Sequence, residues 1–331
     1  MPIHTRLLRI LALAVVLVGR AMPALALPPA AEVMTALNLS ADDQKQVLAG
    51  QYVSHDAKTL NDRDLSVSIA FLVKASPDSL AKQVASGDLI KVDSQVKKTG
   101  IFSDAGSIAD LAGLTIDAAA AKTLAGASAG SSLNLATPEI AALSQLKAGE
   151  VASVQAQLQR MLLARYQAYR TSGLAGIAPY DRGGSRSDPG ADLKTAAEAT
   201  AGLKKYLPSF YNLVTRYPQA TSPGVQQTMR WIKYDIDGTE TYVLSHAMVV
   251  ADGDARAVVN RQYYVSTGYN AGQAVAGFLP VAEGTVVLYN NHTFTDQVAG
   301  FGGSAKRGIG RRMMESKLRA IFDKQKKKVE H

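Results

Sequence analysis

The last third of the chain alternates between apolar and polar residues with a period of two, a pattern typical of β-strands. Five such runs occur, at about residues 230–236, 241–250, 257–266, 273–280 and 285–294. Short turn sequences follow three of them, at Asp237-Gly238, Asp252-Gly253 and Glu283-Gly284. Because connections this short join only antiparallel neighbours, the pattern predicts an antiparallel sheet.

The end of the chain predicts one long amphipathic helix, at about residues 304–327. Its apolar side chains recur at helical spacing, at Ile309, Met313, Leu318, Ile321 and Phe322. A curved antiparallel sheet wrapped around this helix is the simplest arrangement that buries both apolar faces. We therefore expect an α+β fold in which the sheet packs on the C-terminal helix.

Four elements are expected upstream: a helix over residues 32–49, a strand over 65–73, a helix over 77–87 and a strand over 90–97. Asn38 or Ser40 is suited to cap the second half of the first helix. Ser76 is a good N-cap for the second helix, and Pro77 suits its first position.

Residues 103–223 are expected to form a helical insertion before the sheet. We expect short helices in the Ala-, Gly- and Ser-rich residues 103–150 and a long helix over 151–172. A loop is expected over 183–190, followed by a helical stretch over 192–214 that Pro208 interrupts. We expect residues 27–331 to form a single α+β domain, with the sheet and final helix at about 224–328.

The first 26 residues have the three parts of a cleavable secretory signal peptide. Arg6 and Arg9 form a basic head, residues 10–19 an apolar run, and Ala24-Leu25-Ala26 a cleavage site. The apolar run is about ten residues long, whereas a membrane-spanning helix needs roughly 20. We therefore expect a periplasmic protein cleaved near Ala26, with an uncleaved membrane anchor as the alternative.

The chain is basic, with 36 Lys and Arg residues against 28 Asp and Glu residues and a net charge of +8. Cleavage would remove Arg6, Arg9 and Arg20, which leaves 33 basic residues and a charge of +5. Much of the remaining excess lies near the C-terminus, including Lys324 and residues 326–328. This basic helix end is expected to contact an anionic membrane surface or to be simply solvated. Since no nucleic-acid motif is present, no nucleic acid is expected as a partner.

The motifs of several enzyme classes are absent from the sequence. There is no cysteine, which excludes thiol chemistry, and no H-E-x-x-H or P-loop string occurs. No G-x-S-x-G nucleophile elbow is expected either, because the serines next to Gly130 lie in a flexible stretch without a strand before it. His246 and His292 lie on expected strands and could share a metal with Asp235 or Asp296. The alternative, which we favour, is that each histidine is a hydrogen-bonded strand residue. We therefore expect neither a metal nor another cofactor.

Three glycines, Gly300, Gly302 and Gly303, precede the final helix, and Lys306 and Arg307 lie in its first turn. Free N–H groups at a helix start, beside two cations, can hold an anion. Glycines also permit a turn that brings the helix over the sheet. The sequence leaves both interpretations open, and we favour the turn.

The expected strand faces indicate a ligand cavity. Arg261 shares a face with Tyr263, and His246 shares one with Leu244 and Met248. A mostly apolar wall with a few polar groups is typical of a small-molecule site, although a packed sheet face has the same pattern. The candidate ligand-binding residues are Arg261, Tyr263, His246, Leu244, Met248 and Tyr289. A buried guanidinium needs a carboxylate partner, either on the protein or on a ligand. In the expected cavity, Arg261 would meet the acidic or polar head of the ligand.

The order of these elements resembles the helix-grip fold of START-like lipid-transfer domains and polyketide cyclases. The resemblance is carried by the opening strand 67–73 with residues 74–78, and by residues 301–306 with the helix that follows. It implies that the long helix closes a cavity over the sheet and that the cavity takes an apolar ligand.

Two shorter segments, residues 169–180 and 296–302, resemble signatures of an uncharacterised exported proteobacterial protein family. This resemblance supports export and implies no activity. We therefore expect a periplasmic protein that binds a hydrophobic small molecule or lipid between sheet and helix. The alternatives are an envelope enzyme that uses polar groups of the same cavity, such as Arg261 with His246 or Tyr263, and a ligand-free structural or interaction protein.

Overall fold

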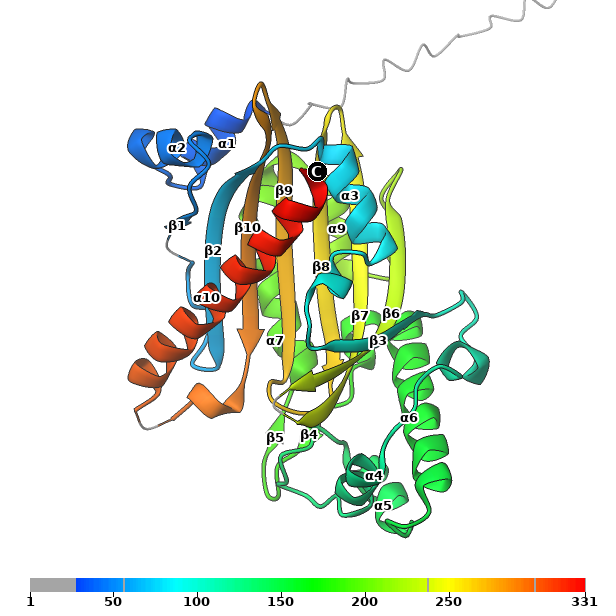
Figure 1. The fold of residues 1–331 in the computed structure, drawn as a ribbon. Helices are drawn as coiled ribbons and strands as arrows, with labels where there is room; N and C mark the ends of the chain where they lie inside the picture. The colour runs from blue at the N-terminus through cyan, green and yellow to red at the C-terminus, as the bar shows by residue number, and fades with distance from the viewer. Residues whose placement is uncertain (1–27, 56, 237, 301, 331) are drawn as a thin grey trace, which may run out of the picture.

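The computed structural model describes residues 28–55, 57–236, 238–300 and 302–330. The expected signal peptide, residues 1–26, lies outside these described residues. The fold is α+β, as the sequence predicts: a large open antiparallel sheet carries the long C-terminal helix on one face and further helices on the other (Figure 1). Within the described residues, no helix is long and apolar enough to cross a membrane.

The sheet has eight strands in the order β1-β2-β10-β9-β8-β7-β6-β3. The five expected strands form a meander of β6 (Gln226–Ile236), β7 (Thr239–Asp252), β8 (Ala255–Val265), β9 (Ala271–Val281) and β10 (Gly284–Phe294). The flanking strands are β1 (Val53–His55), β2 (Asp64–Val73) and β3 (Val96–Ile101). Gly238 and Gly253 take left-handed φ values of 79° and 54° at two of the hairpins, a conformation that the turns require.

One face of the sheet is covered by α10 (Gly303–Val329) and α3 (Pro77–Ser86) (Figure 1). As expected, the hydroxyl of Ser76 caps α3 by accepting a hydrogen bond from the N–H of Ser79 at 3.2 Å. Phe322 of α10 is buried against the sheet, but Ile309 and Met313 are 60% and 69% exposed. The apolar stripe expected along the final helix is therefore buried only in its second half.

The other face is covered by helices of the expected insertion: α6 (Val151–Ser172), α7 (Pro189–Glu198) and α9 (Pro208–Arg216). Phe210 and Leu213 of α9 pack on Met248 and Val259 of the sheet. The same face is covered near β2 by α1 (Ala30–Ala36) and α2 (Ala41–Leu48), which pack on residues such as Leu288. The inserted segment is thus one layer of the core.

The shorter elements are α4 (Ala118–Ala125), α5 (Thr137–Ser144), α8 (Ala201–Tyr206), β4 (Tyr180–Asp181), β5 (Arg186–Ser187) and the 3-10 helices η1 (Ile90–Val92), η2 (Ile108–Leu111), η3 (Gly173–Gly176) and η4 (Asp296–Val298). They include the short helices expected in residues 103–150. The strand expected over 90–97 begins later, at Val96, because the residues before it form η1. The loop expected over 183–190 includes β5 and the start of α7, which Asp188 caps.

The single helix expected over residues 32–49 is two helices. Asn38 takes a left-handed φ of 64° between them, which interrupts the helical hydrogen bonding. Ser40 then starts α2 through a capping box, in which its hydroxyl accepts from the N–H of Asp43 and its own N–H donates to the Asp43 carboxylate. The sequence thus predicts the cap at Ser40 but not the break before it.

Candidate functional site

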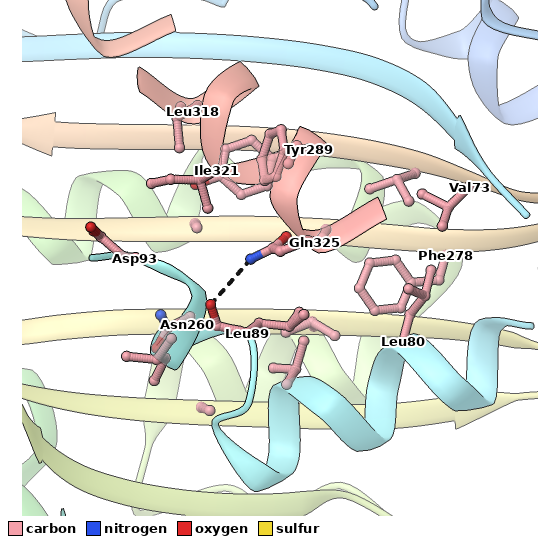
Figure 2. A pocket seen from close by; sticks show the side chains of 18 of the residues that line it. Val73, Leu80, Leu89, Asp93, Asn260, Phe278, Tyr289, Leu318, Ile321 and Gln325 are labelled. Carbon is pink, nitrogen blue, oxygen red and sulfur yellow. Dashed lines mark hydrogen bonds between the residues drawn. The ribbon is translucent and has the colours of Figure 1, made fainter. Parts of the chain in front are cut away.

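A cavity of about 270 Å³ lies between the sheet and the two helices α10 and α3. Most of its lining is apolar and includes Val73, Leu80, Phe278, Tyr289, Leu318 and Ile321. Figure 2 shows Leu80 and Phe278 toward one end of the cavity and Asn260 and Asp93 toward the other. A largely apolar space with a few polar groups at one end is suited to bind a small amphipathic molecule.

Phe322 of α10 seats the helix over this cavity. Its ring stacks on Phe71 with the ring centroids 4.8 Å apart and meets the ring of Tyr289 edge-on at 5.1 Å. Leu318 and Ile321 precede it on the helix, are half-buried and line the cavity (Figure 2). The helix therefore forms a wall of the cavity without filling it.

Polar contacts hold α10 in place on both sides. The Nε2 of Gln325 donates to the carbonyl of Leu89 at 3.3 Å and so joins α10 to the segment after α3 (Figure 2). Toward β1, the hydroxyl of Tyr52 donates to Asp323 at 2.8 Å. The N–H of Lys74, just after β2, donates to Glu330 at 2.8 Å. These contacts keep the second half of α10 over the cavity.

Polar side chains gather at one end of the cavity: Arg230, Ser245, Asn260 and Asp93. Arg230 on β6 lies opposite Ser245 on β7, so the two side chains are neighbours on this face. Arg230 is 3% exposed, and its Nη2 donates to the carbonyl of Ala85 in the last turn of α3. Its buried Nε has no hydrogen-bond partner among the described residues. Burial also lowers the pKa of this guanidinium.

Small side chains on the sheet leave the space for the cavity. Ala247, Ala274 and Ala276 line it. Met248 and Val275, which alternate with these alanines, pack on the other face. Small residues under a helix leave volume that larger side chains would fill. Alternation of small and large residues along β7 and β9 is therefore the sequence signal that could have located the cavity.

The six residues expected to bind the ligand divide between the two faces of the sheet. Tyr289 lines the cavity under α10. The other five lie on the opposite face, beneath α6 and α9: Arg261, Tyr263, His246, Leu244 and Met248. The expectation that these five face the C-terminal helix is therefore corrected. Because β7 is buried on both faces, the alternation groups residues by face without telling which helix covers each face.

Arg261 is the centre of a buried hydrogen-bond network. Its Nε and Nη2 donate to Oε1 of Gln273 at 3.0 and 2.9 Å. Its Nη1 donates to the hydroxyl of Tyr169 at 3.1 Å, and its Nη2 to the carbonyl of Val214 at 2.7 Å. Val214 lies in the last turn of α9, where the helix dipole is negative. Neutral acceptors of the protein thus stand where the acidic or polar ligand head was expected, and Arg261 joins α6 and α9 to the sheet.

His246 extends the same network. Its Nδ1 accepts from the hydroxyl of Tyr169 at 3.0 Å, and its Nε2 donates to Oε1 of Gln227 at 3.0 Å. Burial and the positive charge of Arg261 lower the pKa of His246 to about 3, so the imidazole is neutral near pH 7. The Tyr169 ring also stacks on Tyr263 with centroids 4.0 Å apart. A fully buried neutral histidine with both nitrogens bonded is a structural group.

The histidines considered as metal ligands have separate partners. The Nδ1 of His292 is 2.9 Å from Oδ2 of Asp64. Asp235 accepts from the N–H of Gly238, and Asp296 accepts from Arg182 at 2.9 Å. These contacts agree with the interpretation of His246 and His292 as hydrogen-bonded strand residues. Across the residues that the structure describes, no group of three His, Cys, Asp or Glu side chains is placed to hold a metal ion.

A second cleft, of about 620 Å³, is polar and lies beside β5, near the ends of β8 and β10. Arg182 crosses it and donates to Asp296 at 2.9 Å, to Asn134 at 2.6 Å and to Asn270 at 3.0 Å. Asn270 in turn donates to Asp296 at 2.9 Å. Since these polar groups bond to one another, they brace the surrounding loops.

The glycines before α10 form a tight turn. Gly300 and Gly302 have left-handed φ values of 74° and 72°, and the N–H of Gly303 donates to the carbonyl of Gly300 at 2.9 Å. Arg307 donates to the carbonyl of Asp62 at 2.9 Å, so one of the two cations proposed for an anion site has a protein partner. These contacts favour the turn interpretation.

Comparison of the chain with protein-family models, with curated proteins and with solved structures found no match. The resemblances to helix-grip domains and to exported proteobacterial proteins therefore stay predictions from the sequence. The geometry of the cavity is therefore the main evidence for a function.

Proposed function

We propose that the protein is exported to the periplasm and binds a hydrophobic small molecule or lipid between its sheet and α10. The supporting observation is the largely apolar cavity of about 270 Å³, close to the lower end of the range of about 300–1,000 Å³ typical of ligand sites. At roughly 30 Å³ for a water-sized group, this volume suits a ligand of on the order of ten non-hydrogen atoms. A single medium-length chain fits this description better than a two-chain phospholipid.

The cavity favours ligand binding over a purely structural role, because a sheet packed tightly on a helix would leave no such space. The enzyme alternative depends on Arg261 together with His246 or Tyr263. All three are buried on the opposite face and bonded or packed within the core. Binding is therefore the function that the geometry supports best.

Native mass spectrometry of the protein purified from its own periplasm tests ligand binding. We expect a bound hydrophobic molecule in the wild type. Ala276→Trp fills the cavity and should remove it, whereas Ala320→Trp, on the exposed side of α10, should retain it. A wild-type protein that carries no adduct and takes up no added decan-1-ol would contradict the proposal.

N-terminal sequencing of the mature protein tests export separately. The sequence predicts a first residue at Leu27 or within a few positions of it. A soluble periplasmic protein that retains Met1 would contradict cleavage.

The outer side of α10 supports a further part of the proposal, contact with an anionic membrane surface. Exposed basic residues recur along it, at Lys306, Arg312, Lys317, Lys324, Lys327 and Lys328. Ile309 and Met313, the exposed large apolar residues in the described part of this helix, lie among them. Basic side chains attract anionic headgroups, and exposed apolar side chains can enter the interface. Because α10 also covers the cavity, this contact would place the ligand site next to the membrane.

A further inference from the structure

Arg230 brings a positive charge with few protein partners to the polar end of the cavity. The residue is 3% exposed, and its Nε has no hydrogen-bond partner within the described chain. The acceptor that the structure gives its side chain is the carbonyl of Ala85. A guanidinium has five N–H donors, and leaving a buried one such as the Nε–H unpaired costs free energy. Arg230 is therefore poised to accept a further partner.

Two neighbouring aspartates are engaged elsewhere. Asp88 attracts the Arg230 guanidinium from beyond ion-pair distance, but its carboxylate is bonded to Lys91 at 3.1 Å and to Ser86 at 2.8 Å. Asp93 lines the cavity, and its Oδ1 accepts from the N–H of Gln95 at 3.0 Å. Neither forms an ion pair with Arg230, so the described part of the protein provides no carboxylate in contact with this charge.

The surroundings of Arg230 fit the head of a ligand. Ser245 and Asn260 add neutral polar groups at the same end, and the cavity becomes apolar toward Phe278 (Figure 2). Gly87 ends α3 with a left-handed φ of 80°, and a Cβ at this position would lie 2.9 Å from the Arg230 guanidinium. The glycine therefore lets the guanidinium lie against the end of α3 while it lines the cavity.

We infer that the ligand is an amphiphile with a carboxylate head that binds Arg230 and an apolar chain that lies along Phe278 and Phe322. The inference rests on the proposed function and names the class of ligand. A carboxylate accepts hydrogen bonds from a guanidinium in a planar geometry and supplies the missing counter-charge. An alcohol of the same length fills the same apolar space without that charge.

Decanoate and decan-1-ol have the same chain length. Isothermal titration calorimetry with both compounds therefore separates the contribution of the head group to affinity from that of the apolar chain. We expect the wild type to bind decanoate about 10- to 100-fold more tightly, since a charge-assisted hydrogen bond contributes in this range. Arg230→Gln should lower the affinity for decanoate to that for decan-1-ol and leave the affinity for decan-1-ol unchanged. Arg230→Lys should retain part of the preference.

Lys326 provides the matched control, because it also lines the cavity and its Nζ lies over the Tyr52 ring at 5.4 Å. Lys326→Gln should keep the preference for decanoate. Equal wild-type affinities for the two compounds would overturn the inference while leaving the proposed function intact, and so would an unchanged preference in Arg230→Gln. If neither compound binds the wild type, the proposed function itself fails. The comparison of decanoate with decan-1-ol in the wild type tests the inference even if a variant does not fold.

Discussion

Arg230 and Arg261 project from opposite faces of the same sheet, and each donates to a main-chain carbonyl in the last turn of a helix. Arg230 reaches Ala85 of α3, and Arg261 reaches Val214 of α9. The helix dipole favours a cation at both places. Arg261 has further neutral acceptors and is enclosed by the core, whereas Arg230 lines the cavity with an unpaired Nε. Two buried arginines of one sheet thus differ in how their donors are satisfied.

Replacing Arg261 should lower stability more than replacing Arg230. Arg261→Ala leaves three buried acceptors without a charged donor, and each unsatisfied group costs about 1–3 kcal/mol, so we expect a loss of at least about 3 kcal/mol. Arg230→Ala removes one such contact and should cost about 1–2 kcal/mol. Urea denaturation of both variants measures the difference. An equal or smaller loss for Arg261→Ala would show that the network contributes little.

His246 should make the free energy of unfolding depend on pH. Its pKa falls from 6.5 to about 3 on folding, so between these values the unfolded state binds the extra proton. The stability that neutral His246 contributes is complete above pH 6.5 and is lost as pH falls toward 3. The slope of this loss approaches about 1.4 kcal/mol per pH unit for one proton.

His246→Gln removes this titration and keeps a polar side chain beside Tyr169. Its free energy of unfolding should change less than that of the wild type between pH 6.5 and about 5, where carboxylates with ordinary pKa values near 4 stay ionised. Urea denaturation at a series of pH values gives both slopes. Identical slopes in the two proteins would contradict a buried neutral histidine.

Phe322→Ala should destabilise the protein, because the ring is 8% exposed and contacts both Phe71 and Tyr289. Removing a buried phenylalanine ring costs about 3–5 kcal/mol. Ile309→Ala on the same helix changes a residue that is 60% exposed and should stay within about 0.5 kcal/mol of the wild type. Equal melting of the two variants would show that α10 is not integral to the fold.

The sequence predicts the elements of the central sheet and of α10 because their periodicity is local. The strand runs, the Ser76 cap and the glycine-containing turns each depend on a few consecutive residues. The break at Asn38 is harder to predict, since a left-handed asparagine carries little local signal. The late start of β3 depends on its pairing with β6, far away in the sequence.

The candidate site could be predicted only in part. Alternation correctly groups Arg261 with Tyr263, but the expectation that Tyr289 shares their face is wrong, because Tyr289 lies on the face under α10. It cannot assign α10 to one of the two faces, because the residues on both are apolar. That choice depends on which face offers small residues such as Ala276 beneath the helix, and on how α6 packs on Leu244 and Tyr263.

Gly87→Ala should weaken binding of decanoate without removing the positive charge of Arg230. The added Cβ would lie 2.9 Å from the guanidinium, which would have to move. Gly50→Ala is the control, because Gly50 has a similar φ of 87° and a Cβ added there would meet no atom within 4 Å. Both variants should lose about 1–2 kcal/mol of stability through the left-handed backbone. Decanoate affinity, measured by calorimetry, should fall in Gly87→Ala alone.

Contact of α10 with an anionic membrane should depend on its exposed lysines. The test is a triple variant in which glutamine replaces Lys324, Lys327 and Lys328. Sedimentation with phosphatidylglycerol-containing vesicles compares its binding with that of the wild type. Each lysine near an anionic surface contributes about 1 kcal/mol, so the triple change should reduce partitioning by about 100-fold. Vesicles of phosphatidylcholine alone should bind neither protein, since the attraction is electrostatic.

A second triple variant separates a docking surface from the effect of net charge. Lys45, Lys122 and Lys147 are exposed on other parts of the fold, and replacing them by glutamine removes the same charge. If α10 docks on the membrane, this control should bind anionic vesicles nearly as well as the wild type, because charges beyond a Debye length of about 10 Å from the surface contribute little. An equal loss of binding in the two triple variants would contradict docking through α10 and would indicate general attraction of a basic protein.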